Sequence, residues 1–108
     1  MMGPSLSSPE DLRRAMATGA TLVDVRGPGE RVPGSIPAGS VSCPLNMSDG
    51  TIPLQGLPAD KNAALIVFCA RGGRAARAIE FLNSQGYKNC LNGGGNTTPA
   101  QWDVLMGK

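Results

Sequence analysis

The segment Cys69–Arg74, with the sequence Cys-Ala-Arg-Gly-Gly-Arg, holds the residues best suited to chemistry in this chain. Gly72 and Gly73 permit a tight turn whose successive backbone N–H groups point to one side, and such a concave array binds anions. Three cations lie in or just after the segment: Arg71, Arg74 and Arg77. No acidic residue follows the cysteine before Glu80. These neighbours predict a thiol that ionises readily, because amide and guanidinium groups stabilise a thiolate.

The flanking segments are expected to place the cysteine between a strand and a helix. Residues Ala64–Phe68 are all apolar, which is typical of a central strand in a parallel sheet. An amphipathic helix should follow the loop and end at Gly86, and its apolar face is formed by Ala75, Ala78, Ile79 and Leu82. The positive end of that helix dipole would face the loop and favour an anionic sulfur there.

The sequence contains no histidine. This excludes Ser-His and Cys-His nucleophile pairs and histidine metal sites, and nothing else suggests a metal or an organic cofactor. A cysteine at a strand end is more often a packing residue than a nucleophile, but the loop of glycines and arginines favours the reactive interpretation. We therefore expect Cys69 to be a nucleophile activated by backbone amides and cations.

The rest of the chain alternates between helical and strand patterns. Ser8 is suited to cap a helix that begins at Pro9 and stops near Gly19, and Asp11 completes a capping-box pattern. The other expected elements are strands at Thr21–Val25, Val41–Cys43 and Asn89–Leu91, a turn at Gly93–Gly95 and a helix at Pro99–Leu105. Residues 27–58 contain twelve glycines and prolines and should be mostly loop. This alternation predicts an α/β fold with a parallel sheet, in which ligands bind beyond the carboxyl ends of the strands.

Length and charge limit the classes of function. The chain has 108 residues, which fits one domain spanning 1–108. Its formal charge of +2, from 10 basic and 8 acidic residues, is too balanced to predict nucleic acid or a membrane as the partner. The N-terminal residues lack the apolar stretch of a signal peptide, so we expect a cytoplasmic protein.

Four further residues of chemically active types are expected to be structural. Asp24, at the end of a strand, should accept loop N–H bonds, and Arg26 should pair with nearby acids. Cys43 and Cys90 should fill the core, although a role as a resolving thiol stays open for either. Three cysteines are also too few, and odd in number, for a disulfide framework.

The order of several short motifs resembles the rhodanese (sulfurtransferase) family. The likeness runs from about Ser8 to Leu105. A single Asp-Val-Arg strand end would be weak evidence, but four motifs in the family's order, around a strand–cysteine loop–helix unit, are specific. The matching stretches are Leu22–Arg26, Gly34–Pro37 with Cys43–Leu45, Val67–Arg74, and finally Gly86-Tyr87, Leu91–Gly94 and Trp102.

The resemblance implies a rhodanese-like α/β fold, with a mostly parallel central sheet flanked by helices, and ping-pong chemistry. Cys69 would take the outer sulfur of thiosulfate, a small anionic donor, and hold it as a persulfide. The sulfur would then pass to a thiophilic acceptor such as cyanide or a thiol. Arg71 and Arg74 would steer the oxyanion end of the donor. The backbone N–H groups that would hold the persulfide belong to Ala70, Arg71, Gly72, Gly73 and Arg74.

Of two departures from the family pattern, the one at Ala70 bears on the donor. Ser35 stands where the family often has histidine, and Ala70 occupies a loop position that is often basic. Relatives that use mercaptopyruvate have a Cys-Gly-Ser-Gly type of loop, which this chain lacks, so thiosulfate is the expected donor. The physiological donor and acceptor, and a monomeric or dimeric state, are left open.

Two other functions are compatible with a rhodanese-like chain. A non-turnover sulfur carrier or regulatory binding module would keep the same loop but turn over thiosulfate slowly. A phosphatase of the related Cdc25 type needs five residues between its cysteine and arginine, whereas four separate Cys69 from Arg74. The smaller loop favours a sulfur atom over a phosphate.

Overall fold

A computed structural model describes residues 4–108 of the chain. Its centre is a four-stranded parallel sheet with the strand order β2-β1-β3-β4. The strands are β1 (Thr21–Asp24), β2 (Val41–Ser42), β3 (Leu65–Cys69) and β4 (Cys90–Gly95). Because every pairing is parallel, the carboxyl ends of all four strands reach the same edge of the sheet. The expected α/β fold with a parallel sheet is therefore confirmed.

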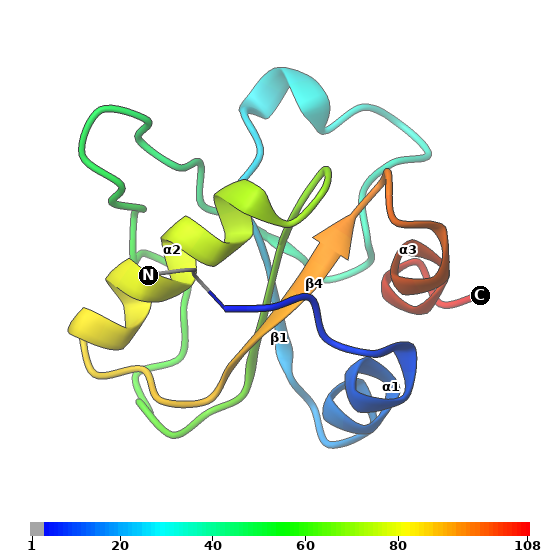
Figure 1. The fold of residues 1–108 in the computed structure, drawn as a ribbon, viewed down its shortest axis with the longest axis horizontal. Helices are drawn as coiled ribbons and strands as arrows, with labels where there is room; N and C mark the ends of the chain where they lie inside the picture. Colours follow the sequence, from blue (N-terminus) through cyan, green and yellow to red (C-terminus); the bar gives the residue numbers. More distant parts are fainter. Residues whose placement is uncertain (1–3) are drawn as a thin grey trace.

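Helices cover both faces of the sheet (Figure 1). Helix α2 (Gly73–Ser84) packs on one face, while α1 (Pro9–Ala17) and α3 (Pro99–Leu105) pack on the other. A short 3-10 helix, η1 (Pro28–Glu30), lies in the loop after β1. None of these helices is long and apolar enough to span a membrane, among residues 4–108.

Strand β3 is buried along its whole length, as its apolar sequence indicates. Val67 packs in the cluster beneath α2, whereas Ile66 and Phe68 belong to the cluster beneath α1 and α3. Alternate residues of a strand point to opposite faces, so one continuous apolar strand supplies both layers of the core. The expected apolar face of α2 is also buried, with Ala75, Ala78, Ile79 and Leu82 all at most 1% exposed.

Helix α1 begins and ends where its sequence indicates. Ser8 is the N-cap, and its Oγ accepts a hydrogen bond of 3.2 Å from the Asp11 backbone N–H. Pro9 occupies the first helical position, where it sacrifices no hydrogen bond. The helix ends at Ala17, and Gly19 reverses the chain with a φ of 90°.

The turn expected at Gly93–Gly95 is wrong, because these glycines belong to β4. The missing side chains of Gly93 and Gly95 reflect close approach to β3. A Cβ on Gly93 would lie 2.7 Å from Ile66 Cγ2, and one on Gly95 would overlap the Cys69 carbonyl. Strand β4 also carries one more residue than β3 between the paired positions Val67↔Asn92 and Cys69↔Gly95, a β-bulge directly beside the cysteine.

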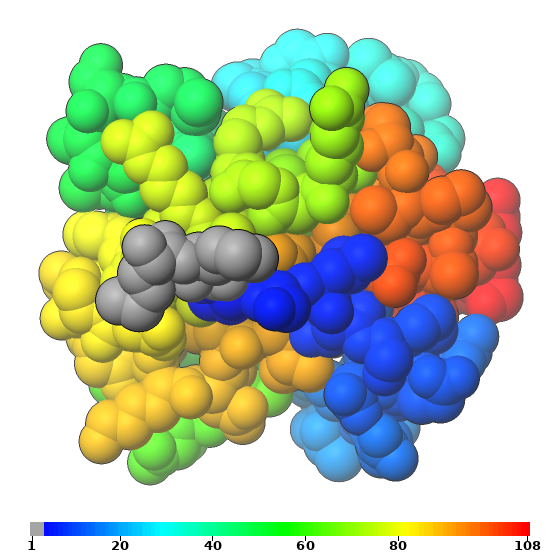
Figure 2. Space-filling model, viewed as in Figure 1, coloured from blue at the N-terminus to red at the C-terminus, as the bar shows by residue number. Residues whose placement is uncertain are grey.

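The loops that follow β1, β3 and β4 meet at one edge of the sheet. In Figure 2 the segments coloured cyan, light green and orange adjoin at the top of the molecule. Arg26 NH1 donates to Asn96 Oδ1 over 3.5 Å, and the Thr97 backbone N–H donates to the Ala70 carbonyl over 2.9 Å. Three segments distant in sequence are thus joined around the residue that follows Cys69.

Replacing Gly95 with alanine should destabilise the fold strongly, because the new Cβ would overlap the Cys69 carbonyl of the neighbouring strand. We expect a loss of about 3 kcal/mol or more in the free energy of unfolding, measured by urea denaturation. Gly29→Ala is the matched control, since a Cβ there meets nothing within 4 Å. Equal stability of the two variants would contradict this account of β4.

Candidate active site at the carboxyl end of β3

Cys69 is the last residue of β3 and is 1% exposed. Its Sγ accepts a hydrogen bond of 3.1 Å from the Gly72 backbone N–H. Gly72 is the N-cap of α2, which begins at Gly73. The expected placement is therefore observed: the sulfur lies between a strand end and the first turn of a helix, where the partial positive charge of the helix favours an anion.

Gly72 adopts a left-handed conformation with a φ of 105°. Residues with a side chain rarely adopt this conformation, and a Cβ here would also lie only 3.1 Å from Asn92 Oδ1. The left-handed turn directs the Gly72 N–H toward the sulfur while its carbonyl begins the α2 ladder by accepting from the Ala76 N–H over 2.9 Å. The glycine in the loop is thus required by the geometry that presents the N–H.

Asn92 fixes the far side of the loop. It is 3% exposed, and its Nδ2 donates to the carbonyls of Gly72 (3.0 Å) and Pro4 (3.1 Å). Its Oδ1 accepts from the Gly94 N–H over 3.0 Å. No role for Asn92 was predicted from the sequence. The available signal was a polar residue within an otherwise buried strand, because such a group needs hydrogen-bond partners.

A second contact holds the start of the loop. The Ala70 carbonyl accepts from both the backbone N–H and the hydroxyl of Thr97, at 2.9 and 2.8 Å. Thr97 lies in the turn after β4, and this turn is closed by Thr98 Oγ1, which accepts from the Gly95 N–H over 2.9 Å. The backbone on both sides of Cys69 is therefore tied to β4 and the turn that follows it.

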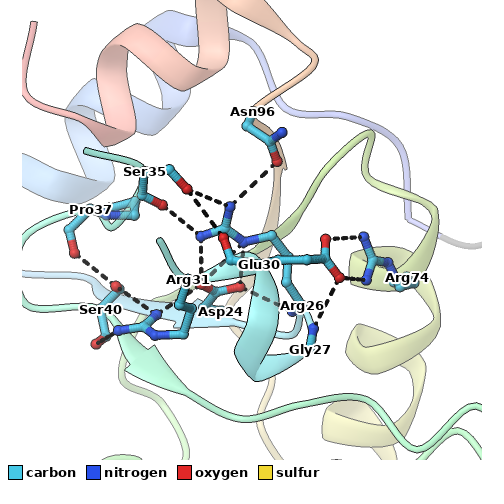
Figure 3. A network of polar contacts seen from close by, with 10 residues as sticks. All are labelled: Asp24, Arg26, Gly27, Glu30, Arg31, Ser35, Pro37, Ser40, Arg74 and Asn96. Carbon is cyan, nitrogen blue, oxygen red and sulfur yellow. Dashed lines mark hydrogen bonds and ion pairs between the residues drawn. The ribbon is translucent and has the colours of Figure 1, made fainter. Parts of the chain in front are cut away.

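The two arginines expected to steer a substrate lie in different environments. Arg74 forms a two-point ion pair with Glu30 of η1, at 2.7 and 3.0 Å (Figure 3). Arg71 is exposed and makes no ion pair with any of residues 4–108. Arg77 is also outside the cysteine loop, because its NH1 donates to the Met47 carbonyl over 2.8 Å. Glu30 was not identified from the sequence.

The Arg74 guanidinium is affected by the charge of Cys69 as well as by the Glu30 carboxylate. Its pKa is raised first by the hydrogen bonds that it donates to Glu30, and further by the charge of Cys69. In turn, the hydrogen bonds from Arg74 hold the pKa of Glu30 below its usual value. Glu30 and Arg74 are therefore both charged at neutral pH.

A buried ion network supports the loop that carries Glu30. Arg26 is 1% exposed and Asp24 is fully buried, with 2.8 Å between Arg26 NH2 and Asp24 Oδ2. Arg31 NH1 contacts the same Asp24 oxygen at 2.8 Å. Arg26 also donates to the Ser35 carbonyl over 2.7 Å and its hydroxyl over 3.2 Å. The expected structural pairing of Asp24 with Arg26 is thus observed, and Ser35 is an acceptor in the same network.

Arg26 also connects this network to the opposite layer of the fold. Its guanidinium carbon lies 5.5 Å from the ring centroid of Phe68 and 5.4 Å from that of Trp102. Phe68 directly precedes the cysteine, and the cation–π contacts add to the anchoring of that strand end. Arg26 therefore contacts the loop after β1, the end of β3 and helix α3.

The other two cysteines are not part of the Cys69–Arg74 loop. Cys43 is fully buried, and burial raises the pKa of its thiol, helped by the charge of Asp24. Burial likewise raises the pKa of Cys90 to about 11. Both are free thiols that pack against the core beneath α2, as expected. No group of three or more cysteine, aspartate or glutamate side chains is placed to bind one metal ion, among residues 4–108.

Asp24→Asn should destabilise the protein because it removes the carboxylate that compensates two guanidinium groups. Breaking a buried pair in this way costs about 3–5 kcal/mol, and urea denaturation would measure it. Asp49→Asn is the control, since Asp49 is exposed and contacts only Thr51 of its own loop. A loss below about 1 kcal/mol in the free energy of unfolding of Asp24→Asn would show that the ion network does not stabilise the fold.

Comparison with known proteins places this chain in a family. The model of the family described as Rhodanese-like domain matches residues 8–96. A sulfurtransferase from Allochromatium vinosum is 32% identical over 71 residues, which cover 66% of this chain, and the chain spans only 62% of that protein's length.

Solved structures agree with this assignment. The human single-domain sulfurtransferase TSTD1 is similar with a TM-score of 0.63 and 28% identity, covering 88% of this chain and 95% of that one. The Bacillus anthracis CoADR-RHD structure matches 96% of this chain but only 17% of its own length, at a TM-score of 0.66 and 24% identity, and shows the fold alone. The parallel sheet, the cysteine loop at the end of β3 and the match over residues 8–96 lead to one conclusion: the chain belongs to the rhodanese-like domain family.

Proposed function

We propose that this protein is a sulfurtransferase that carries sulfane sulfur as a persulfide on Cys69, with thiosulfate as the donor. The observation that carries the proposal is the hydrogen bond from the Gly72 N–H to Cys69 Sγ at the first turn of α2, beside the Arg74 guanidinium. This arrangement stabilises a negative sulfur without imidazole, since backbone donors and a helix N-terminus act as a preorganised anion site.

The first half-reaction moves one sulfur atom to the enzyme. The Cys69 thiolate attacks the outer sulfur of thiosulfate, a new S–S bond forms, and the S–S bond of thiosulfate breaks. Sulfite leaves with the electron pair of that bond. The product is a Cys69 persulfide anion, so charge is conserved and no external oxidant or reductant is needed. The N–H groups of residues 70–74 are the groups available to stabilise the terminal sulfur.

The second half-reaction returns the cysteine to its starting state. Cyanide or a thiolate attacks the terminal sulfur of the persulfide, which breaks the S–S bond and releases the Cys69 thiolate as the leaving group. The acceptor departs as thiocyanate or as a new persulfide. Because Cys69 is nucleophile in one step and leaving group in the other, an environment that stabilises its thiolate assists the second step.

Exposure makes Arg71 the better candidate for recruiting a donor anion. Its charge is not engaged by any carboxylate of residues 4–108, whereas Arg74 already holds Glu30 at two points. The names of two relatives support the class of reaction, since both the Allochromatium protein and human TSTD1 are called sulfurtransferases. TSTD1 is also matched over 95% of its length.

Thiosulfate treatment should add the mass of one sulfur atom to the protein, and cyanide should remove it. Intact mass spectrometry checks this, because the persulfide is a covalent adduct. Cys69→Ser should gain nothing. Cys43→Ser and Cys90→Ser are matched controls that should still gain one sulfur, since burial raises the pKa of both thiols and so disfavours their thiolates. Sulfur uptake that persists in Cys69→Ser would contradict the proposal.

Turnover distinguishes an enzyme from a sulfur carrier. Continuous production of thiocyanate from thiosulfate and cyanide, proportional to protein concentration, is expected for the enzyme. A carrier would form the persulfide once and turn over slowly. In a separate assay, the protein should not hydrolyse an aryl phosphate, because the loop is one residue shorter than a phosphatase loop requires.

Arg71→Ala should raise the KM for thiosulfate by about three- to tenfold with a smaller effect on kcat, because it removes an exposed cation at the site. Steady-state kinetics at low ionic strength gives the clearest measurement, since salt screens such charges. Arg13 is an exposed residue of α1, so Arg13→Ala removes the same charge elsewhere and should leave KM unchanged. Identical kinetics in both variants would remove Arg71 from donor recruitment.

A further inference from the structure

Glu30 reaches the cysteine loop from a distant part of the chain. It is the last residue of η1, and its carboxylate binds Arg74, which is 44 residues away in sequence. The pair lies at the surface of the site, with side-chain exposures of 29% for Arg74 and 43% for Glu30. Glu30 Oε1 also accepts from the Gly27 N–H over 3.2 Å, so the carboxylate is held by its own loop as well as by Arg74.

The ion pair changes the charge that a substrate would meet. Arg74 uses both terminal nitrogens for Glu30, at 2.7 and 3.0 Å. An oxyanion approaching Cys69 must therefore compete with a carboxylate for this guanidinium, or bind Arg71 instead. In addition, the negative charge of Glu30 repels an incoming anion directly, and repulsion grows in proportion to the charge of that anion.

Glu30 is paired with Arg74, and it is the one carboxylate of this group that lies at the surface. Behind it, Asp24 is fully buried and is compensated by Arg26 and Arg31. In front, Arg71 is exposed and Arg74 is shared. Two features still favour an anion at the sulfur, the start of α2 and Arg71, while Glu30 opposes the accumulation of further negative charge.

We propose that Glu30 is a specificity-determining residue that sets how much negative charge a sulfur donor can carry. By holding Arg74 in a two-point ion pair, Glu30 reduces the advantage that the doubly charged thiosulfate has over donors with one negative charge. The donor class favoured by this effect is the thiosulfonate, which transfers an outer sulfur as thiosulfate does but carries one negative charge. This inference rests on the proposed function for its reaction. The effect of the Glu30 charge on anions that approach Cys69 can nevertheless be measured without sulfur transfer.

The chemistry is balanced for such donors in the same way as for thiosulfate. With benzenethiosulfonate, the Cys69 thiolate attacks the outer sulfur and forms the persulfide, and benzenesulfinate leaves with the electron pair of the broken S–S bond. The donor has one negative charge where thiosulfate has two, and the bond that breaks is of the same type. Because the donors also differ by a phenyl ring, the effect of charge is read from how a change at Glu30 alters the use of each donor.

Glu30→Gln tests the proposal because it removes the charge but keeps the size and hydrogen-bonding ability of the side chain. We expect kcat/KM for thiosulfate to rise about three- to tenfold more than kcat/KM for benzenethiosulfonate, chiefly through KM. Glu80→Gln is the matched control, because it makes the same change at an exposed residue of α2 outside the loop. It should alter neither kcat/KM value. An equal change for both donors would mean that Glu30 only supports the structure, and would overturn the proposal.

Alkylation of Cys69 gives a second readout that needs no sulfur transfer. The ratio of its rates with iodoacetate and iodoacetamide, an anion and a neutral reagent, reports the local charge. Peptide mass mapping assigns the product to Cys69, and reaction elsewhere should be slow because the pKa values of Cys43 and Cys90 are raised. Glu30→Gln should raise the ratio about threefold or more, and Glu80→Gln should not.

The two experiments separate the inference from the function on which it rests. An increased alkylation ratio in Glu30→Gln, in a protein whose Cys69 takes up no sulfur, would support the role of Glu30 and contradict the proposed function. An unchanged ratio in a protein that does transfer sulfur would overturn the role of Glu30 and leave the function intact. Thermal unfolding of both variants shows whether each is folded.

Discussion

The hydrogen bond from the Gly72 N–H to Cys69 Sγ is the interaction on which the rest of the site depends. It forms only if Gly72 is left-handed, with the loop compressed between β3 and α2. Asn92 holds the Gly72 carbonyl from behind, and Gly95 allows β4 to pass directly against Cys69. The glycines of β4 and the asparagine within it are therefore as much part of the site as the loop itself, although none of them is suited to react.

A second set of interactions determines which charges surround the sulfur. The buried Asp24 holds Arg26 and Arg31, and Arg26 continues to Ser35 and the turn after β4. This network shapes the loop after β1, from which Glu30 reaches Arg74. In the proposed mechanism, the backbone of one segment forms the anion site, and a carboxylate from another segment limits its strength. Affinity for sulfur anions and selectivity among them would then arise from different parts of the chain.

Local patterns carried most of what the sequence could predict. The apolar β3, the amphipathic α2, the Ser8 cap and the Cys69 loop depend on neighbours in sequence, and all are observed where expected. Interactions between distant segments were missed. Nothing local to Glu30 indicates Arg74 as its partner, and the glycines of β4 suggest a turn until the closeness of β3 is known. Their conformations are determined by packing, which no short window of sequence contains.

The chain contains no histidine, so no imidazole changes its charge near the site in the neutral range. The lowered pKa of Glu30 keeps its carboxylate ionised throughout the neutral range, and arginine stays protonated there. The stabilisation from this ion pair is therefore fully present above the ordinary pKa of a glutamate and is lost only as the pH falls through the lowered value. The Glu30–Arg74 ion pair therefore stays charged across the neutral range and adds no pH dependence there to the proposed sulfur transfer.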